Sequence, residues 1–494
     1  MVKSGKDISA GKGRENVVFS SLTFLLLFLP VLLLLYFLRH GRRWRNGVLI
    51  AMSLLFYGWG EPVWILAMVF STAVNYLCAL AIDRSGSRTV RRLCLTLGIL
   101  ISVGFLFYFK YAGFFGGMLI TLFRLPWAAP SPRLPIGISF YTFQVLTYTV
   151  DVYRKKAPVQ RSFFRLLLYV SCFPQLIAGP IVQYADVADQ LRSRAVTPED
   201  FSAGMQRFAL GLGKKVLLAN LCGEALESTV LAGSGGTLSL LGSWLSAFLY
   251  TLQIYYDFSA YSDMAIGLGR VLGFTYKENF RYPYAAFSIT DFWRRWHISL
   301  GSFFRDYVYI PLGGNRRGAL RTGRNMLIVW MLTGLWHGAS WNFILWGAYY
   351  GVLLMLERFV LSRPLERCPR AVRHVLTMLL VVFGWVLFYY TDLSAAGEHL
   401  LAMMGLTAKG GRLAAAPLTD PAALRVLREY TFFPLLAFIL SLPVVPLLRE
   451  RLERSNPGRR TADLLRTVGA AGAAVLSVLF LVGQSYNPFI YFRF

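Results

Sequence analysis

Apolar runs long enough to cross a lipid bilayer recur along this chain, and they constrain its fold more than any other feature. A transmembrane helix needs about 20 consecutive apolar residues. Candidate spans lie at 17–38, 47–59, 63–82, 93–109, 134–150, 163–182, 203–222, 237–260, 326–341, 343–361, 374–391, 431–447 and 466–483. Several are short or interrupted by Gly and Pro, and such segments are tolerated at membrane depth only inside protein or along a cavity. We therefore expect an all-α polytopic membrane protein with about 11 to 12 transmembrane helices and further re-entrant helices.

The composition excludes a soluble multidomain protein. Of the 494 residues, 56% are hydrophobic and 15% are charged, whereas a soluble domain carries about 25% charged residues. The run at 17–38 is too long for the apolar core of a cleaved signal peptide, so it is interpreted as the first spanning helix. We expect a disordered extension at 1–16 and a single membrane domain at 17–494.

The strong positive charge fits a membrane protein better than a nucleic-acid-binding one. Lys and Arg number 51 against 25 Asp and Glu, which gives a formal net charge of +26. The basic residues cluster between apolar runs, as they do in the cytoplasmic loops of membrane proteins. The clusters lie at 39–45, 84–92, 154–161, 316–324, 358–373 and 449–460. Placing all of them in the cytoplasm puts the N-terminus and the tail after residue 483 outside, and it excludes a nucleic-acid partner.

A polar region interrupts the apolar pattern between about residues 253 and 342, and ionisable side chains at membrane depth are functional candidates. Asp257 and Asp263 have a spacing that favours hydrogen bonding or helix capping over a metal site. The five cysteines are scattered without a C-x-x-C pair, and no G-x-S-x-G, Walker A or H-E-x-x-H motif occurs. We expect neither a metal nor a bound cofactor.

Two of the five histidines fall within this polar region. His337 follows the apolar run 326–336 and is flanked by tryptophans. It is either a buried histidine satisfied by one hydrogen bond or a general base in a dry channel, because imidazole is well matched to proton transfer near neutral pH. His297 lies among tryptophans and arginines, where an interfacial helix explains it equally well. The other three, expected to be solvated or interfacial, are His40, His374 and His399.

The chain ends in an apolar, aromatic segment at 486–494. Solvated tails are usually polar and small, so we expect this segment to dock against protein. One role is that of an aromatic anchor at the membrane interface. Another is that Tyr491 accepts an acyl group, because a phenol ionises at about pH 10, far more readily than an alcohol.

The motifs resemble those of the membrane-bound O-acyltransferases, in particular the bacterial branch typified by the membrane subunit of alginate O-acetyltransferase. The resemblance covers nearly the whole chain after Val17, and the pair WRRWHISL and LWHGA makes it highly specific. The matching stretches are LPIGISFYTFQ (134–144), FPQLIAGPI (173–181), YYDFSAYSDMAIGLG (255–269), DFWRRWHISL (291–300), RDYVYIPLGGNR (305–316), GLWHGASW (334–341), GWVLF (384–388) and PFIYFRF (488–494).

This resemblance implies a ring of tilted helices around a central funnel in the bacterial cytoplasmic membrane. It implies that His297 and His337 lie at the narrow centre, with His337 as the catalytic histidine and His297 at the position of the second polar residue, often Asn in eukaryotic relatives. It also implies acyl transfer from a cytoplasmic thioester to an acceptor that approaches from outside. Tyr491 resembles a C-terminal tyrosine thought to carry acyl groups in related envelope systems.

From this resemblance we expect acetyl-CoA to be the donor and His337 to take the proton of the acceptor hydroxyl. His297, Ser259 or Tyr261 would hold the developing oxyanion, and one such donor contributes about 3–4 kcal/mol. The basic cytoplasmic face would attract the CoA phosphates. The remaining residues expected at the substrate site are Asp257, Arg294, Arg305, Asn315 and Trp336.

The expected function is O-acetylation of an extracytoplasmic polysaccharide, either an alginate-like exopolysaccharide or a cell-wall polymer. Nothing in the chain resembles a carbohydrate-binding groove, so an exported SGNH-type acetyltransferase is expected to choose the acceptor. D-alanyl transfer and peptidoglycan O-acylation remain alternatives within the same fold. A non-enzymatic role in polysaccharide export is an alternative of a different class.

Overall fold

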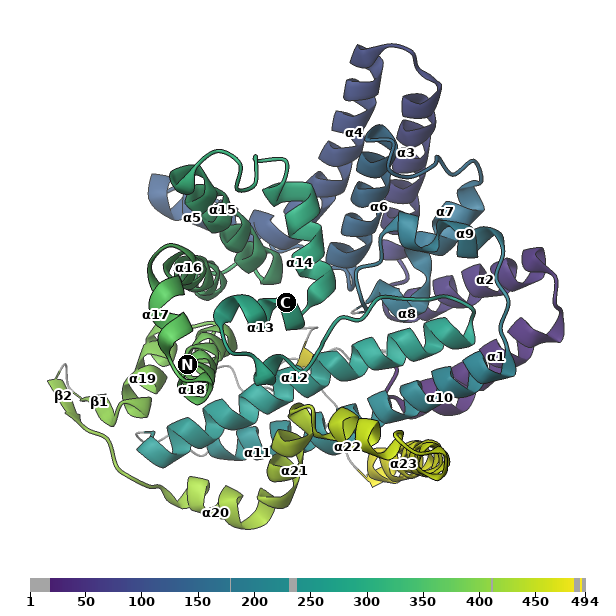
Figure 1. Cartoon of the computed structure of the whole chain (residues 1–494). Coiled ribbons are helices and arrows are strands. Elements are labelled where there is room, and N and C mark those ends of the chain that lie inside the picture. Colours follow the sequence, from purple (N-terminus) through teal and green to yellow (C-terminus); the bar gives the residue numbers. More distant parts are fainter. Residues whose placement is uncertain (1–17, 178, 231–237, 410–411, 484–488, 491–494) are drawn as a thin grey trace. The chain divides into compact units, whose positions relative to one another are not determined.

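The computed structural model describes residues 18–177, 179–230, 238–409, 412–483 and 489–490, in which the regular elements are helices and one two-stranded hairpin, joined by loops (Figure 1). The extension expected to be disordered, 1–16, lies outside the described residues. The chain forms two compact units. One comprises Met1–Phe109, Arg133–Ile177 and Gln183–Arg194, and the other comprises Lys110–Pro132, Ala178–Val182 and Ala195–Phe494.

The first unit is a helical bundle fastened by a buried polar cluster. Asn75 on α3 is fully buried; its amide nitrogen donates to Ser102 Oγ at 2.9 Å, and its carbonyl oxygen accepts from Thr149 Oγ1 at 2.7 Å. These bonds satisfy the polar groups that α3, α4 and α6 bring together, as burial requires. The helices of this unit are η2 (Phe24–Phe28), α1 (Leu29–Leu38), α2 (Arg42–Gly60), α3 (Trp64–Arg84), α4 (Arg88–Leu106), α6 (Ile138–Tyr153), α7 (Phe163–Ser171), α8 (Phe173–Leu176) and α9 (Tyr184–Arg192).

The second unit holds the polar region and the larger aromatic core. A π-helical turn, η3 (Phe107–Tyr111), runs into it from α4. Its other elements are α5 (Ala112–Phe123), α10 (Pro198–Gly213), η4 (Lys214–Ala219), α11 (Asn220–Val230), α12 (Leu240–Val271), η6 (Pro283–Ala285), α13 (Ile289–Arg295), α14 (Ile298–Phe304), η7 (Arg305–Tyr309), α15 (Ala319–His337), α16 (Trp341–Leu356), η8 (Glu357–Leu361), α17 (Ser362–Arg367), α18 (Arg370–Tyr389), α19 (Leu393–Met403), β1 (Leu406–Lys409), β2 (Arg412–Ala415), α20 (Pro421–Tyr430), α21 (Phe432–Ser441), α22 (Val444–Leu452) and α23 (Asn456–Gly483).

Helix α12 forms the axis of this second unit. It has 32 residues, most of them buried, and it packs against α10, α11, α18, α19, α20 and α21. In Figure 1 it is the long teal helix that passes beside α18. Because other helices surround it, α12 can carry polar side chains at membrane depth that a lipid-facing helix could not.

Among the described residues, five helices are long and apolar enough to cross a membrane. They are Trp64–Arg84, Arg88–Phe123, Trp341–Arg367, Arg370–Tyr389 and Pro457–Gly483. A sixth span arises if Phe432–Ser441 and Val444–Leu452, bent by 63°, cross together. The prediction of a multi-pass all-α membrane protein is therefore confirmed, while the larger number of crossings and the orientation stay predictions.

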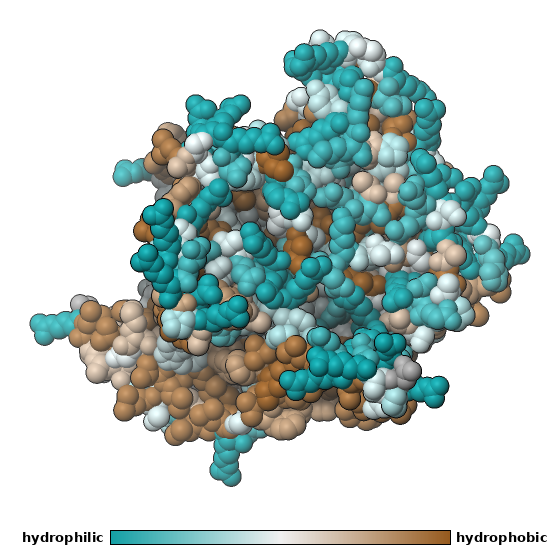
Figure 2. Space-filling model, viewed as in Figure 1, coloured by the Kyte–Doolittle hydropathy of each residue, from teal (hydrophilic) through white to brown (hydrophobic). Residues whose placement is uncertain are grey.

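Apolar side chains are exposed on the surface of several helices, as contact with lipid requires. Figure 2 shows an apolar area over α20 and α21, where Phe432 is 68% and Leu435 is 54% exposed. Each predicted apolar run contains a helix, although 163–182 is broken between α7 and α8 and 431–447 is bent. The segment 392–430, which lies between two of the predicted runs, holds α19, the hairpin and α20.

Candidate active site

His297 joins two short helices in an unusual backbone conformation. It lies between α13 and α14 with φ 44° and ψ 53°, the left-handed region that residues with a side chain rarely adopt. Such strain persists only where the surroundings enforce it, and it gathers at functional sites. The residue is 2% exposed, so protein encloses its ring.

Asn279 anchors the turn that carries His297. It is fully buried, and its Oδ1 accepts hydrogen bonds from the backbone N–H of Ser299 at 3.1 Å and from the Ser299 hydroxyl at 2.9 Å. The same oxygen lies 3.3 Å from Nδ1 of His297. Asn279 was not predicted as a site residue, because a lone Asn in a loop carries no recognisable pattern. Its signal was its place beside an acidic residue at the edge of the polar region.

His337 is the last residue of α15 and lies in an aromatic cage. It is 6% exposed, and its ring centroid lies 5.2 Å from Trp346 and 5.0 Å from Phe388. Trp336 contacts both motif histidines, with ring centroids 4.9 Å from His337 and 5.8 Å from His297. The structure thus brings together two residues that the sequence places 40 positions apart.

Two glycines allow the backbones of α15 and α16 to come into contact near His337. A Cβ on Gly334 would overlap the carbonyl oxygen of Phe343, and one on Gly347 would overlap the carbonyl oxygen of Trp330. Interiors this close-packed cannot absorb an added methyl group without a shift. The glycine before the LWHGA histidine therefore fixes the crossing that places His337.

A lysine and a tyrosine from the π-helical turn η3 cap the end of α15 just before His337. Lys110 Nζ donates to the carbonyl oxygen of Trp336, and Tyr111 Oη donates to that of Leu335 at 2.8 Å. A cation is favoured at a helix C-terminus, where carbonyl groups lack intrahelical partners. The sequence analysis missed Lys110, although a single cation inside a long apolar run was a usable signal.

A small cavity beside His337 is closed in part by the C-terminal segment. The cavity has a volume of about 20 Å³, and its lining includes His337, Asp257 and Ile490, so it holds about one water-sized group. The backbone N–H of Ile490 donates to Asp257 Oδ2 at 2.7 Å. The ring of Phe489 lies 5.0 Å from that of Tyr261. Docking of the tail is therefore confirmed for these two residues, while Tyr491 lies outside the described residues.

Asp257 is held by a buried ion pair. Its Oδ1 lies 2.6 Å from Nζ of Lys215, and the two side chains are 3% and 4% exposed. This agrees with the expected hydrogen-bonding role of Asp257. Lys215 was not predicted as a site residue, although it lies inside the predicted span 203–222 and was detectable by the same rule that selected Asp257.

A second cavity, of about 190 Å³, lies beside His297. Aromatic and apolar side chains form most of its wall, together with Thr333 and Arg305. The side chain of Arg305 is 62% exposed and pairs with Asp306 at 2.8 Å. An exposed guanidinium, paired with a carboxylate, and a buried imidazole therefore line the same cavity.

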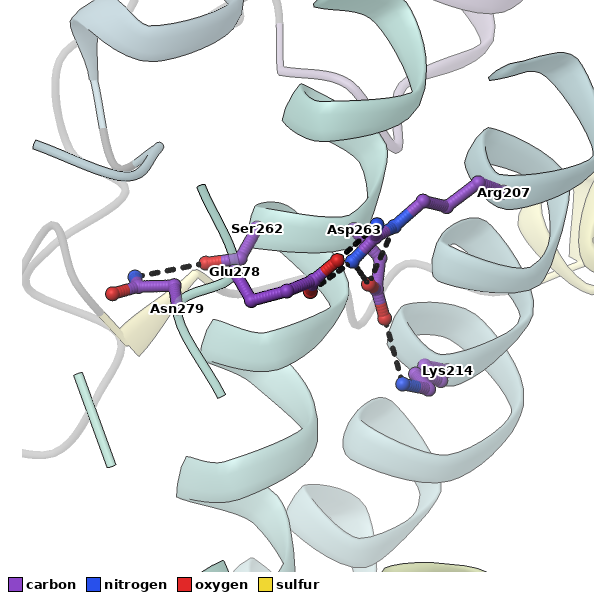
Figure 3. Close-up of polar contacts among 6 residues, drawn as sticks. All are labelled: Arg207, Lys214, Ser262, Asp263, Glu278 and Asn279. Atoms are coloured by element: carbon purple, nitrogen blue, oxygen red, sulfur yellow. Dashed lines mark hydrogen bonds and ion pairs between the residues drawn. The ribbon is translucent and has the colours of Figure 1, made fainter. Parts of the chain in front are cut away.

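A third, polar cavity of about 160 Å³ lies beside a cluster of charges and includes Ser259 and Asn279 in its lining. Arg207 contacts Asp263 at 2.8 Å and Glu278 at 2.5 Å, and Lys214 contacts Asp263 at 2.7 Å (Figure 3). Asp263 is therefore an ion-pair residue. Two cations balance two anions, so the cluster ties α10 and η4 to α12 and to the loop that carries Asn279.

Two of the predicted substrate residues lie at the surface. Arg294 on α13 and Asn315 in the turn after η7 are exposed, and neither contributes to the walls of the three cavities. Among the described residues, no group of three or more His, Cys, Asp and Glu side chains could hold a metal ion.

The other histidines have structural surroundings. His40 is exposed, and His374 Nδ1 lies 3.0 Å from the carbonyl oxygen of Ala286. The expectation for His399 was wrong, because this residue is 3% exposed. Its ring lies between the Tyr390 hydroxyl at 2.8 Å and the carbonyl oxygen of Ser243 at 3.0 Å. His399 lies on α19, which packs on α12 and buries the ring.

Comparisons with known proteins agree with this geometry. A sequence model of MBOAT, the membrane-bound O-acyltransferase family, matches residues 118–395. The chain is 39% identical over 493 residues to a Pseudomonas putida protein named probable alginate O-acetylase AlgI, a match that covers 97% of this chain and 100% of the relative. It is 31% identical over 526 residues to the peptidoglycan O-acetyltransferase of Helicobacter pylori, covering 97% and 98%.

A more distant relative extends the family beyond acetyl groups. The chain is 27% identical over 289 residues to the teichoic acid D-alanyltransferase of Bacillus subtilis, which covers 52% of this chain and 71% of the relative. The family match spans more than half of the sequence and includes both motif histidines. The chain therefore belongs to the membrane-bound O-acyltransferase family, in its AlgI-like branch, and is a multi-pass membrane O-acyltransferase.

Proposed function

We propose that this enzyme takes an acetyl group from cytoplasmic acetyl-CoA and passes it across the bacterial cytoplasmic membrane for O-acetylation of an extracytoplasmic polysaccharide. The observation that carries this proposal is that two buried histidines, His297 and His337, both contact the ring of Trp336, and each lines a separate cavity. Relatives named as alginate O-acetylases match nearly the whole chain, which favours an alginate-like polymer or a cell-wall polymer as the acceptor.

His337 acts as the general base in this proposal. It takes the proton of the attacking hydroxyl while the hydroxyl oxygen bonds to the thioester carbonyl carbon. The tetrahedral intermediate then collapses, the carbon–sulfur bond breaks, and the imidazolium returns the proton to the thiolate of CoA. The aromatic cage supports this role, because a water-poor site protects the thioester from hydrolysis.

The donor enters through the cavity that contains His297 and Arg305. A CoA thioester carries phosphates at one end and a narrow pantetheine arm at the other. The exposed guanidinium of Arg305 suits the phosphate end, and the apolar wall suits the arm. Arg294 and Asn315, which are exposed, would act only as outer contacts for the same donor.

The oxyanion needs a hydrogen-bond donor, and one well-placed donor contributes about 3–4 kcal/mol. Ser259 and Tyr261 are buried on α12, whose Asp257 lines the His337 cavity. Trp336 sets the distance between the histidines by contacting both rings. His297 is a third candidate for this hydrogen-bond donor.

The C-terminal tyrosine is proposed as an acyl carrier. Ile490 lines the His337 cavity, and Tyr491 follows it directly in the sequence. The phenol oxygen would attack the thioester carbonyl, the proton would pass through His337 to the thiolate, and an acetylated tyrosine would result. The hydroxyl of an exported SGNH-type acetyltransferase would then take the acetyl group and regenerate the phenol.

Two other acyl transfers are possible in the same site. Acetylation of peptidoglycan is favoured by the full-length match to a peptidoglycan O-acetyltransferase. D-alanyl transfer is favoured by a partial match alone. A D-alanyl donor and acetyl-CoA differ in size and charge, so competition between these two donors separates D-alanyl transfer from acetyl transfer.

The test uses the full chain in lipid nanodiscs, incubated with acetyl-CoA labelled in its acetyl group. The expected result is a labelled tail peptide in the wild type and none in Tyr491→Phe or His337→Ala. Full acetyl transfer by Tyr491→Phe, with no label on the tail of the wild type, would refute the carrier role. Labelling from a D-alanyl carrier protein alone would refute the acetyl donor.

A further inference from the structure

The amide of Asn279 has one possible orientation. Its Oδ1 receives the backbone N–H of Ser299 at 3.1 Å, and a backbone N–H can only donate. Its Nδ2 donates to Ser262 Oγ at 3.2 Å. The atom that faces His297 is therefore the amide oxygen.

The hydroxyl of Ser299 is also fixed by its neighbours. Its oxygen accepts the backbone N–H of Ile181 at 3.0 Å, and its proton is donated to Asn279 Oδ1 at 2.9 Å. The backbone N–H of Ile298 donates to the carbonyl oxygen of Asn279 at 3.0 Å. Asn279 therefore holds the turn after His297 through its side chain and its backbone together.

These bonds determine which nitrogen of His297 carries the proton. Nδ1 lies 3.3 Å from Asn279 Oδ1 and 3.5 Å from Ser299 Oγ. The first oxygen can only accept, and the second has already donated its single proton. Nδ1 must therefore carry a hydrogen, and Nε2 of the neutral ring carries the lone pair.

We propose that Asn279 is a positioning residue that holds His297 as the Nδ1-protonated tautomer, so that His297 takes part in acyl transfer through Nε2 as a hydrogen-bond and proton acceptor. A neutral ring in this state has no proton at Nε2 to give to an oxyanion. The oxyanion must then be held by another donor, of which Ser259 and Tyr261 remain. The catalytic part rests on the proposed function, whereas the tautomer is a property of the resting protein.

The direct test is nitrogen NMR of the full chain in nanodiscs, with ¹⁵N-labelled histidine and no substrate. A spectrum of His297→Gln identifies the two signals of His297. The expected result is a protonated Nδ1 and an unprotonated Nε2. A protonated Nε2, in either the neutral ring or the imidazolium, would overturn the proposal whether or not acetyl-CoA is the donor.

Variants of Asn279 test the positioning role separately. Asn279→Leu removes the acceptor and should mix the His297 tautomers and lower kcat by about 100-fold, a loss typical of a ligand or base whose orienting partner is removed. Asn279→Asp keeps an acceptor and should restore the Nδ1–H signal and most of kcat. Ser262→Ala removes only the partner of Nδ2, so its His297 signals should match the wild type. Equal kcat losses in the Leu and Asp variants, with an unchanged His297 spectrum in both, would contradict the role.

Discussion

Replacing the buried Lys215–Asp257 ion pair by apolar residues should release the C-terminal segment without unfolding the protein. Breaking a buried pair by removing one partner costs about 3–5 kcal/mol, because one charge stays buried, whereas replacing both by apolar residues is neutral or stabilising by about 1–4 kcal/mol. The side chains are 4% and 3% exposed, so these values apply without a discount for solvent. Lys215→Met alone should therefore be unstable, and Lys215→Met with Asp257→Leu should be close to the wild type.

The double variant still removes the acceptor for the Ile490 N–H, which lies 2.7 Å from Asp257. A hydrogen bond to a charged group contributes about 1.5–3 kcal/mol, which corresponds to an increase of about 10- to 150-fold in the opening of the tail. Thermal unfolding in detergent measures the stability, and hydrogen exchange of the tail peptide measures the opening.

The matched control is the exposed Asp200–Arg270 pair, whose side chains are 38% and 50% exposed. Arg270→Met should change the stability by less than about 1 kcal/mol and leave tail exchange unchanged. The reasoning would be refuted if the double variant exchanged the Ile490 amide as slowly as the wild type. It would also be refuted if Lys215→Met melted like the wild type.

Three further predictions concern the mounting of His337 and the entry of the donor. Lys110→Met should lower kcat at least tenfold more than Tyr111→Phe does, because the lysine caps the carbonyl group next to His337. The KM for the donor should be the same in both variants. Equal losses of kcat in the two variants would indicate simple helix capping. Gly334→Ala should destabilise by about 1–3 kcal/mol through overpacking, whereas Gly397→Ala, which meets no atom within 4 Å, should be neutral or stabilising by about 0.5–1 kcal/mol. Arg305→Ala should raise the KM for acetyl-CoA and leave kcat nearly unchanged, and an unchanged KM would remove Arg305 from the donor site.

Hydropathy predicted the class of fold well and its details less well. The apolar runs all contain helices, because burial and lipid both demand that backbone polar groups pair within the segment. The same pattern could not show which helices face lipid. Residues 240–260 of the run at 237–260 belong to α12, a 32-residue helix enclosed by other helices. Apolar residues that face protein look like those that face lipid.

The candidate site was predictable where a residue stood out from its surroundings. His337 and Asp257 were found because an ionisable group in an apolar context is costly. Asn279 was missed because its role depends on contacts with Ser262 and Ser299, which are distant in the chain. Lys215 could have been found by the rule that selected Asp257, but only the fold shows that the two side chains pair. Arg294 and Asn315 were selected by motif membership, which does not show whether a side chain lines a cavity; both are exposed, and their role at the donor site stays a prediction.

The most direct test of the central claim compares the polysaccharides of cells that carry the wild-type chain with those of cells that carry His337→Ala. Mass analysis reports both the amount of exported polymer and its acetyl content. An acyltransferase that depends on His337 predicts that export continues while the acetyl groups are lost. Unchanged acetyl content in His337→Ala, with the protein present at wild-type level in the membrane, would contradict the account.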